Sequence, residues 1–429
     1  MAFQQVDVLE VHAWGRRVGA LAASPTSRAY AFRYDPAWRS GELSPILMPL
    51  SPRGRTWVFP NLPEETFHLL PPLIADSAPD RFGNAIITAA LGREGIAPAQ
   101  LRPIDRLAYV GERAMGALTF HPSQAPSHLP TGFEIASLVE SARAALQGTL
   151  DDDGRTESLQ QLIAVGTSAG GARAKAVIAW DPGTGEVRAG GLASPPGFEQ
   201  WLLKFDGVGE DLQLGVGGDY GRTEYAYSLM ARAAGIEMTE CRLLHEGGRA
   251  HFMTRRFDRP GSDGERVHMQ TLCALQALDY NAVDTHDYAS LFLTAEQLGV
   301  QAEDQLFRRM CFNVLAANND DHTKNHAFIR AEGGDWELAP AYDLTYAYAK
   351  GHRWLDRHLM SVNGRFAGIT RRDLLSVADQ FMVPGAKRVL AEVAEAVAGW
   401  PEAAREAGVG AERTRLVAAR LAEIAEETA

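Results

Sequence analysis

The sequence has few cysteines, no excess of positive charge and no long apolar run, and each shortage excludes a class of protein. Its 429 residues include only three cysteines, without a CxxC spacing: Cys241, Cys273 and Cys311. That usage fits a reducing compartment and argues against a disulfide framework or a zinc ribbon. No window approaches the roughly 20 consecutive apolar residues of a membrane span. The N-terminus lacks a basic segment followed by an apolar stretch, so we expect a cytoplasmic protein without membrane contact.

Lys and Arg together number 42 against 54 Asp and Glu, which gives a net charge of -12. This balance argues against non-specific binding of nucleic acid through a broad basic surface. Hydrophobic residues make up 46% and charged residues 22%, and these fractions exclude a largely disordered chain. At about 150 residues per domain, the length predicts two or three domains.

Hydrophobic patterning predicts a β-rich N-terminal half and a mostly helical C-terminal half. Near-alternation and aromatic content predict strands, whereas apolar residues at i+3 and i+4 steps predict helices that cover a core. The expected strands are 6–14, 28–34, 107–111, 116–120, 175–180, 201–205 and 327–329. The expected helices are 84–90, 223–234 and 306–317, with a proline-rich linker at 122–131. After residue 260 the chain is expected to be mostly helical, and the apolar spacing between 390 and 424 predicts amphipathic helices at the C-terminus.

The densest polar run is 318–326, Asn-Asn-Asp-Asp-His-Thr-Lys-Asn-His, between an apolar helix and an apolar strand. Polar groups near a core are costly unless each has a partner or a ligand. Two chemistries use such a cluster: phosphoryl transfer, and metal-dependent hydrolysis with Asp and His ligands. Asp320 precedes Asn325 by five residues, the offset of Asp and Asn in the HRDxxxxN loop of protein kinases. Asp343 lies 23 residues after Asp320 and follows a short predicted strand. The aspartate that holds magnesium in protein kinases occupies the corresponding place.

Upstream features supply candidates for phosphate binding. Glycines at 166, 170 and 171 free backbone N–H groups for close approach to phosphate, although the loop matches neither the P-loop nor the Rossmann pattern. Lys204 lies in an apolar strand, where a lysine needs a partner or an edge position. Glu224, in the following helix, is an available partner, as in the kinase Lys–Glu pair.

Five motifs in order resemble the HipA-type serine/threonine kinases, which are toxins of type II toxin–antitoxin pairs. They are the glycine-rich run 168–175, Lys204-Phe205, 256–259 (Arg-Phe-Asp-Arg), 319–325 and 341–344 (Ala-Tyr-Asp-Leu). The segments 75–84 and 110–118 resemble the N-terminal subdomain of these proteins. The resemblance runs nearly end to end.

The resemblance implies an α+β, bilobal kinase-like fold with a β-rich N-terminal subdomain and a helical C-terminal lobe. The implied domains are an N-terminal subdomain at 1–125, a nucleotide-covering lobe at 126–255 and a helical catalytic lobe at 256–429. It also implies ATP and Mg²⁺ as cofactors, with Asp320 as the catalytic base and Asn325 and Asp343 as magnesium ligands. The implied nucleotide contacts are Ser168, Ala169, Gly170, Gly171, Lys175, Lys204, Arg256, Phe257, Asp258 and Lys324.

The implied partners are a helix-turn-helix antitoxin of HipB type, with DNA contacted mainly through that antitoxin, and a protein substrate such as an aminoacyl-tRNA synthetase or another translation factor. Ser168 matches the family's autophosphorylation position, with Thr167 as the second choice. Two positions depart from the pattern: Arg255 stands where many relatives have Glu, and Asp321 places a second carboxylate beside the base.

Two other functions remain open from the sequence. A metal-dependent phosphohydrolase would use Asp320, Asp321, His322 and Asp343 as a metal cluster. A non-catalytic module of a repressor complex would bind a DNA-binding protein without phosphoryl transfer. His322 also fits a structural role, packed beneath the loop.

Overall fold

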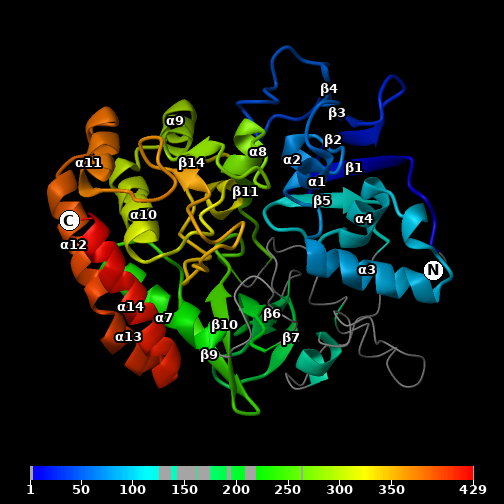
Figure 1. Ribbon diagram of the computed structural model, residues 1–429. Helices are drawn as coiled ribbons and strands as arrows, with labels where there is room; N and C mark the ends of the chain where they lie inside the picture. Colours follow the sequence, from blue (N-terminus) through cyan, green and yellow to red (C-terminus); the bar gives the residue numbers. More distant parts are fainter. Residues whose placement is uncertain are drawn as a thin grey trace. The chain divides into compact units, whose positions relative to one another are not determined.

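The computed structural model of the chain describes residues 3–124, 137–142, 162, 174–190, 195–207, 219–261 and 264–428 (Figure 1). The chain divides into two compact units. Unit 1 comprises Met1–Gly209, Met253–Gln270 and Ile329–Asp335, and unit 2 comprises Glu210–Phe252, Thr271–Phe328 and Trp336–Ala429. Each unit is therefore assembled from segments far apart in the sequence. The three-domain division at 125/126 and 255/256 stays a prediction.

Unit 1 begins with an antiparallel five-stranded sheet in the order β4-β3-β2-β1-β5. Alternation along β1 buries Leu9, Val11 and Ala13 on one face, as the sequence predicts for its first strand. Helices α1 to α4 complete this part, and Phe32, Phe67, Phe82 and Phe120 lie fully buried in its core. The bounds are β1 Val8–Ala13, β2 Arg16–Ala23, β3 Tyr30–Tyr34, β4 Thr56–Val58, α1 Glu64–Phe67, α2 Pro72–Ala75, α3 Arg81–Arg93, the 3₁₀ turn η1 Pro98–Gln100, α4 Pro103–Val110 and β5 Leu118–His121.

The strand expected at 107–111 is wrong, because these residues end helix α4. Pro103 occupies the first helical turn, where its missing N–H costs nothing, and the Asp105 side chain accepts a hydrogen bond from Arg102 N at 3.1 Å. Ile104, Leu107 and Ala108 then share one buried helical face. The start signal at Pro103 outweighs the strand-like composition of residues 107–111.

A second sheet of unit 1 carries β6 (Lys175–Trp180) between β7 (Val187–Ala189) and β8 (Glu199–Lys204). The first five residues of β6 are buried, as expected for a central strand. On its other side β8 adjoins β10 (Arg249–Arg255), whose last three residues belong to unit 1. The antiparallel register of β6 and β8 places Lys175 directly opposite Lys204.

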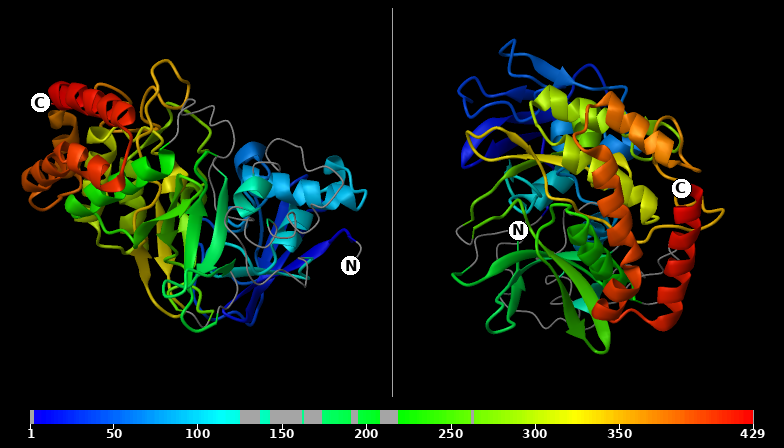
Figure 2. Two further views of the ribbon diagram at one scale, coloured as in Figure 1. Left: turned by 90° about the horizontal axis from the view of Figure 1, so that it is seen from below. Right: turned by 90° about the vertical axis from the view of Figure 1, so that its left-hand side faces the viewer.

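Unit 2 is mostly helical. Tyr227 of α7 packs against Phe312 of α10 and Trp400 of α13, with ring centroids 6.1 and 5.6 Å apart, and these helices lie together with α12 and α14 (Figure 2). The Tyr227 hydroxyl donates to Ala316 O at 2.7 Å, just before the polar run. The amphipathic C-terminal helices predicted from the sequence are confirmed as α12 to α14.

The remaining elements include short strands that flank the polar run; β13 lies between β11 and β14, and β12 pairs in parallel with β15. Their bounds are α7 Tyr220–Ala233, β9 Cys241–Glu246, β11 His268–Thr271, α8 Leu272–Gln276, β12 His286–Asp287, α9 Ala289–Leu298, α10 Glu303–Leu315, the 3₁₀ turn η2 Thr323–Asn325, β13 Ala327–Arg330, β14 Trp336–Leu338, β15 Met360–Ser361, α11 Arg371–Gln380, α12 Ala386–Ala398, α13 Trp400–Ala407 and α14 Ala411–Thr428. In the described part of the chain, no helix is long and apolar enough to cross a membrane.

Burial of His268 makes the stability of unit 1 depend on pH. His268 is 1% exposed and its Nε2 lies 2.9 Å from Leu43 O. Burial lowers the pKa of its ring from 6.5 to about 4. Between these values the unfolded chain binds a proton that the folded chain excludes. We therefore expect this group to remove about 1.4 kcal/mol of stability per pH unit as the pH falls from 6.5 to 4.

The comparison that checks this is urea unfolding of the wild type and His268→Gln at several pH values in that window. Glutamine keeps an N–H donor but does not titrate. The variant should show the shallower dependence, and parallel curves would contradict the assignment.

Candidate active site

Helix α10 and strand β13 position the polar run 318–326, which we call the catalytic loop. Every residue of α10 from Leu306 to Leu315 is buried, so the helix end is fixed in the core of unit 2. Asn319 N donates to Ala347 O at 3.1 Å, and its side-chain Nδ2 donates to Leu355 O at 3.0 Å. The loop therefore begins at the end of the buried helix α10. Its second residue, Asn319, is hydrogen-bonded to the segment that follows Asp343.

The two neighbouring carboxylates of the loop lie in opposite environments. The Asp320 side chain is 43% exposed, whereas that of Asp321 is fully buried. Asp321 accepts hydrogen bonds from Tyr288 Oη at 2.8 Å, Leu359 N at 2.7 Å and Met360 N at 3.4 Å, and it pairs with His358 Nδ1 at 2.9 Å. Asp320 is thus the carboxylate of this pair that can reach a ligand.

Asn325 closes the loop through its side chain. Its Nδ2 donates to the backbone oxygen of Asp320 at 2.7 Å, across the five-residue spacing that the sequence pattern singles out. The carboxamide oxygen, which is the atom that binds hard metal ions, is not used by this bond. Lys324 lies with its Nζ 4.5 Å from the centre of the Tyr280 ring, a cation–π contact.

Asp343 lies on a segment tied to the same loop. The hydroxyl of its neighbour Tyr342 donates to Lys324 O at 2.7 Å, and Ala341 N donates to Glu237 O at 2.8 Å. Asp343 has a φ of +56°, a left-handed conformation that is uncommon outside glycine. Backbone held in such a region is concentrated at functional sites, which favours a functional role for this carboxylate.

The histidines of the loop are packed rather than grouped as ligands. Burial lowers the pKa of His326 to about 4 and also lowers the pKa of His322, whose ring lies 5.4 Å from that of Tyr280. In the part of the chain that the structure describes, no group of three His, Cys, Asp or Glu residues could hold a metal ion. With Asp321 bonded inward as well, the four-residue metal cluster of the hydrolase alternative has no support.

The lysines predicted to bind nucleotide lie in unit 1 on adjacent strands. Lys175 and Lys204 are opposite each other in the register of β6 and β8, and both are buried. Directly opposed residues of an antiparallel pair have their Cβ atoms about 5 Å apart on one face of the sheet. The fold therefore brings together two cations that are 29 residues apart in sequence. Glu224 is buried in α7 of unit 2, and its pairing with Lys204 stays a prediction.

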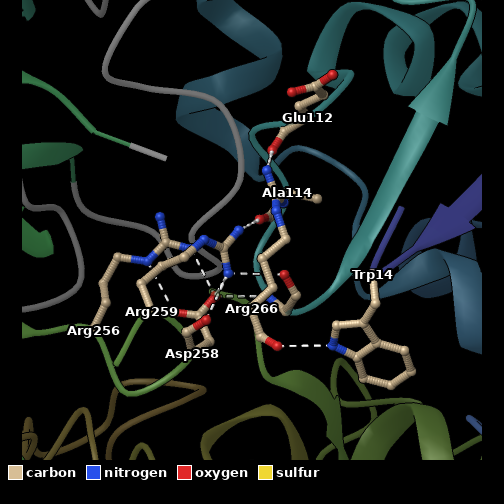
Figure 3. A network of polar contacts seen from close by, with 8 residues as sticks. Trp14, Glu112, Ala114, Arg256, Asp258, Arg259 and Arg266 are labelled. Atoms are coloured by element: carbon tan, nitrogen blue, oxygen red, sulfur yellow. Dashed lines mark hydrogen bonds and ion pairs between the residues drawn. The ribbon is translucent and has the colours of Figure 1, made fainter. Parts of the chain in front are cut away.

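The Arg-Phe-Asp-Arg motif forms a buried network within unit 1 (Figure 3). The Asp258 carboxylate accepts from Arg256 Nε at 2.9 Å and Nη2 at 2.7 Å, from Arg259 Nη1 at 2.8 Å and from Gly116 N at 2.7 Å. Arg259 also donates to Gly116 O at 2.9 Å and to Ala114 O at 2.9 Å. The motif therefore joins residues 256–259 to the segment 114–116 of the N-terminal part.

The buried charges of this network are stabilised by ion pairs between Asp258 and the two arginines. Burial opposes ionisation of Asp258, yet the charges of Arg256 and Arg259 and the hydrogen bonds that it accepts keep its pKa well below the ordinary range. A neighbouring link extends the network, because Arg266 donates to Glu112 O at 2.6 Å and Trp14 donates to Arg266 O at 2.8 Å (Figure 3).

The three residues of this motif that are predicted to contact nucleotide differ in burial and in hydrogen bonding. The Asp258 carboxylate is fully engaged inside the protein, whereas Arg256 Nη1 has no hydrogen-bond partner among the described residues and Phe257 is half-buried. Arg255, one of the two departures from the family pattern, lies 3.4 Å from Glu199 in a partly exposed ion pair. Nucleotide binding by Arg256, Phe257 and Asp258 stays a prediction.

Some predicted residues lie outside the described part of the chain, and some structural partners were missed. Ser168, Ala169, Gly170 and Gly171, and with them the autophosphorylation site, fall in the undescribed range 163–173. Sequence reasoning did not identify Tyr288, His358 or Tyr280, which support the catalytic loop from positions 33 to 44 residues away along the chain. No local pattern marks them.

Comparisons with known proteins identify the family of the chain. A model described as the HipA-like C-terminal domain matches residues 167–400, more than half of the chain, and one described as the HipA N-terminal domain matches residues 9–121. The search of curated proteins found no match.

Two solved structures are similar. The HipA toxin of Shewanella oneidensis MR-1, solved with HipB and its operator DNA, has 16% identity and a TM-score of 0.62 over 98% of this chain and 96% of that one. The Helicobacter pylori proinflammatory kinase CtkA has 11% identity and a TM-score of 0.37 over 54% of this chain and 85% of that one, too low to support an inference. The first similarity confirms the predicted α+β, kinase-like fold of HipA type. With both family models matched, the chain belongs to the HipA family.

Proposed function

We propose that this protein is an ATP- and Mg²⁺-dependent serine/threonine kinase of HipA type that acts as a toxin. The observation that carries the proposal is the catalytic loop, in which Asp320 lies partly exposed while Asn325 is bonded to its backbone and Asp321 is buried beneath it. Phosphoryl transfer requires little more than a positioned base, a held metal and balanced charge. In this proposal the loop supplies the base, Asp320, and one of the two metal ligands, Asn325.

In this proposal Asp320 orients the acceptor hydroxyl and takes its proton. Lys175 and Lys204 place positive charge together on one strand pair, which suits the negative charge of a triphosphate. Phe257 and Arg256 are the candidates for contact with the nucleotide base, and Lys324 adds charge on the catalytic loop. Ser168, Ala169, Gly170 and Gly171 are proposed to approach the phosphates through backbone N–H groups.

The donor atoms proposed for the metal are of the kind that magnesium prefers. Asn325 Oδ1 and the Asp343 carboxylate are hard oxygen ligands, and Mg²⁺ is commonly held by one or two such groups together with phosphate oxygens. The hydrogen bond from Asn325 Nδ2 to Asp320 O fixes which end of the carboxamide remains for a metal. Bound Mg²⁺ supplies neutralisation of the charge that develops on the transferred group.

The proposed partners extend the family assignment. A HipB-type helix-turn-helix antitoxin is the proposed regulator, with DNA reached mainly through it, as the solved Shewanella complex contains both. The proposed substrate is a protein with an accessible Ser or Thr hydroxyl, such as an aminoacyl-tRNA synthetase or another translation factor. Tight binding of an antitoxin with no ATP binding at all would instead favour the non-catalytic repressor module.

Calorimetric titration with ATP tests the cofactor assignment. We expect ATP binding by the full chain to be strengthened by Mg²⁺, and Asp343→Asn to reduce that strengthening while leaving metal-free binding unchanged. Asp379→Asn, at an exposed position in α11, is the control and should behave as the wild type. Absence of ATP binding under both conditions would overturn the proposed function.

Autophosphorylation of the glycine-rich loop is a further expected outcome. Phosphate on Ser168 would add about -1.5 to -2 charges at neutral pH. That charge would compete with ATP for the same N–H groups or pair with Arg173, and both effects oppose closure of the loop on nucleotide. We expect peptide mapping after incubation with Mg-ATP to locate phosphate on Ser168, with Thr167 as the second choice, and the modified protein to bind ATP more weakly. An active preparation without phosphate on either residue would contradict this.

A further inference from the structure

Asp321 is the most completely bonded carboxylate of the catalytic loop. Its Oδ1 accepts from Leu359 N and Met360 N, and its Oδ2 accepts from Tyr288 Oη and faces His358 Nδ1 at 2.9 Å. His358 donates in this contact when its proton is on Nδ1. Two of these donors are the backbone N–H groups of Leu359, just before β15, and Met360, its first residue. The Asp321 side chain therefore ties the loop to main chain that begins 38 residues later in the sequence.

A second layer of hydrogen bonds holds the first in place. Asn313 Nδ2 donates to Tyr288 Oη at 2.8 Å, and Asn318 Nδ2 donates to Asn313 Oδ1 at 2.8 Å. Burial and the nearby Asp321 charge raise the pKa of Tyr288 well above its ordinary value, so its hydroxyl stays a donor. Asn318 and Asp321 are both in the catalytic loop, so the bonds form a closed circuit from the loop through α10 and Tyr288 and back to the loop.

Asp320 and Asp321 share a peptide unit. The hydrogen bonds that hold Asp321 therefore also restrain the backbone of Asp320, the proposed base. Any movement of the Asp321 backbone moves Asp320, whose side chain faces the opposite environment. A misplacement of about 1 Å at a reacting group can cost about 100-fold in rate. Removing one charge from Asp321 also leaves donors facing a carboxamide N–H₂, which cannot accept from them.

We propose that Asp321 is a positioning residue, whose carboxylate anchors the catalytic loop on residues 358–360 and so holds Asp320 in place to act. The predicted loss of activity rests on the proposed kinase function, whereas the anchoring itself does not. The competing explanation is that Asp321 merely contributes to the stability of unit 2.

The test compares Asp321→Asn with Asp373→Asn, a matched change elsewhere in unit 2. Asp373 is also a buried carboxylate with several donors, namely Thr370 N, Thr370 Oγ1 and Asn363 Nδ2 at 2.7 to 3.0 Å, and it caps helix α11. Both variants of the full chain are studied by hydrogen–deuterium exchange and, at a temperature where both remain folded, by transfer from labelled Mg-ATP to lysate protein.

We expect Asp321→Asn to accelerate exchange in peptides covering 318–326 and 358–361 by about tenfold or more, and Asp373→Asn to leave these peptides unchanged. We expect kcat to fall by about 10- to 100-fold in Asp321→Asn, with the affinity for Mg-ATP within twofold of the wild type, and Asp373→Asn to keep its rate.

Two results would overturn the proposal: unchanged exchange of both segments in Asp321→Asn, or equal losses of kcat in the two variants after matching for thermal stability. If the wild type transfers no phosphate, the proposed function fails, and the exchange comparison still decides whether Asp321 anchors the loop.

Discussion

Replacement of Asp320 by alanine should lower the rate of phosphoryl transfer by about 10²- to 10⁴-fold while ATP and Mg²⁺ still bind. The side chain is the exposed carboxylate of a loop whose backbone is fixed by Asn325, Asn319 and Asp321, so its loss removes a proton acceptor without releasing the loop. A positioned general base contributes a factor of this size. Steady-state transfer rates and calorimetric ATP affinities, measured on the same preparations, distinguish a loss of catalysis from a loss of ATP binding.

Asp284→Ala is the matched control for this comparison. Asp284 belongs to the same unit, has a side chain 46% exposed, and forms an ion pair with Arg357 at 3.4 Å in solvent. It should keep the wild-type rate. Full activity in Asp320→Ala, or an equal loss in both variants, would show that the base is another residue.

The largest effect on stability is expected at Asp258. Removing this carboxylate leaves Arg256 and Arg259 buried side by side without their shared counter-charge, and Gly116 N loses its acceptor. Breaking a buried pair from one side typically costs about 3–5 kcal/mol. We therefore expect Asp258→Ala to lower the free energy of unfolding of unit 1 by about that amount, measured by urea unfolding with tryptophan fluorescence. Trp14, Trp38, Trp57, Trp180 and Trp201 are in this unit.

Glu186→Gln provides the comparison for an exposed pair in the same unit. Glu186 lies 2.6 Å from Arg188, with both side chains at least one-third exposed, and such pairs contribute about 0–1 kcal/mol. A similar small change in Asp258→Ala would mean that the network of Figure 3 does not hold the motif to the N-terminal part.

The elements that the sequence predicted correctly are those in which local pattern and burial agree. Strand β6 is apolar from Ala176 to Trp180, and α12 to α14 repeat apolar residues at i+3 and i+4. Helix α4 was not predicted because residues 107–111 have strand-like composition. The proline that starts the helix, Pro103, lies four residues before that segment.

The sequence motifs indicated which residues form the candidate site, but they did not indicate which way the side chains of those residues face. The spacing of Asp320, Asn325 and Asp343 identified the loop, yet it did not indicate which of two adjacent carboxylates faces inward. That choice is made by Tyr288 and His358, which are distant in sequence. In the same way, nothing near Asp258 indicates that its partners include Gly116.

The fate of the γ-phosphoryl group tests the central claim most directly. The full chain is incubated with a cytoplasmic lysate and Mg-ATP labelled at the γ or the α position, with Asp320→Ala in parallel. The account predicts that only γ-label enters protein, as acid-stable phosphoserine or phosphothreonine, and that it does so only with the wild type. Label released solely as inorganic phosphate, or equal labelling by Asp320→Ala, would contradict it.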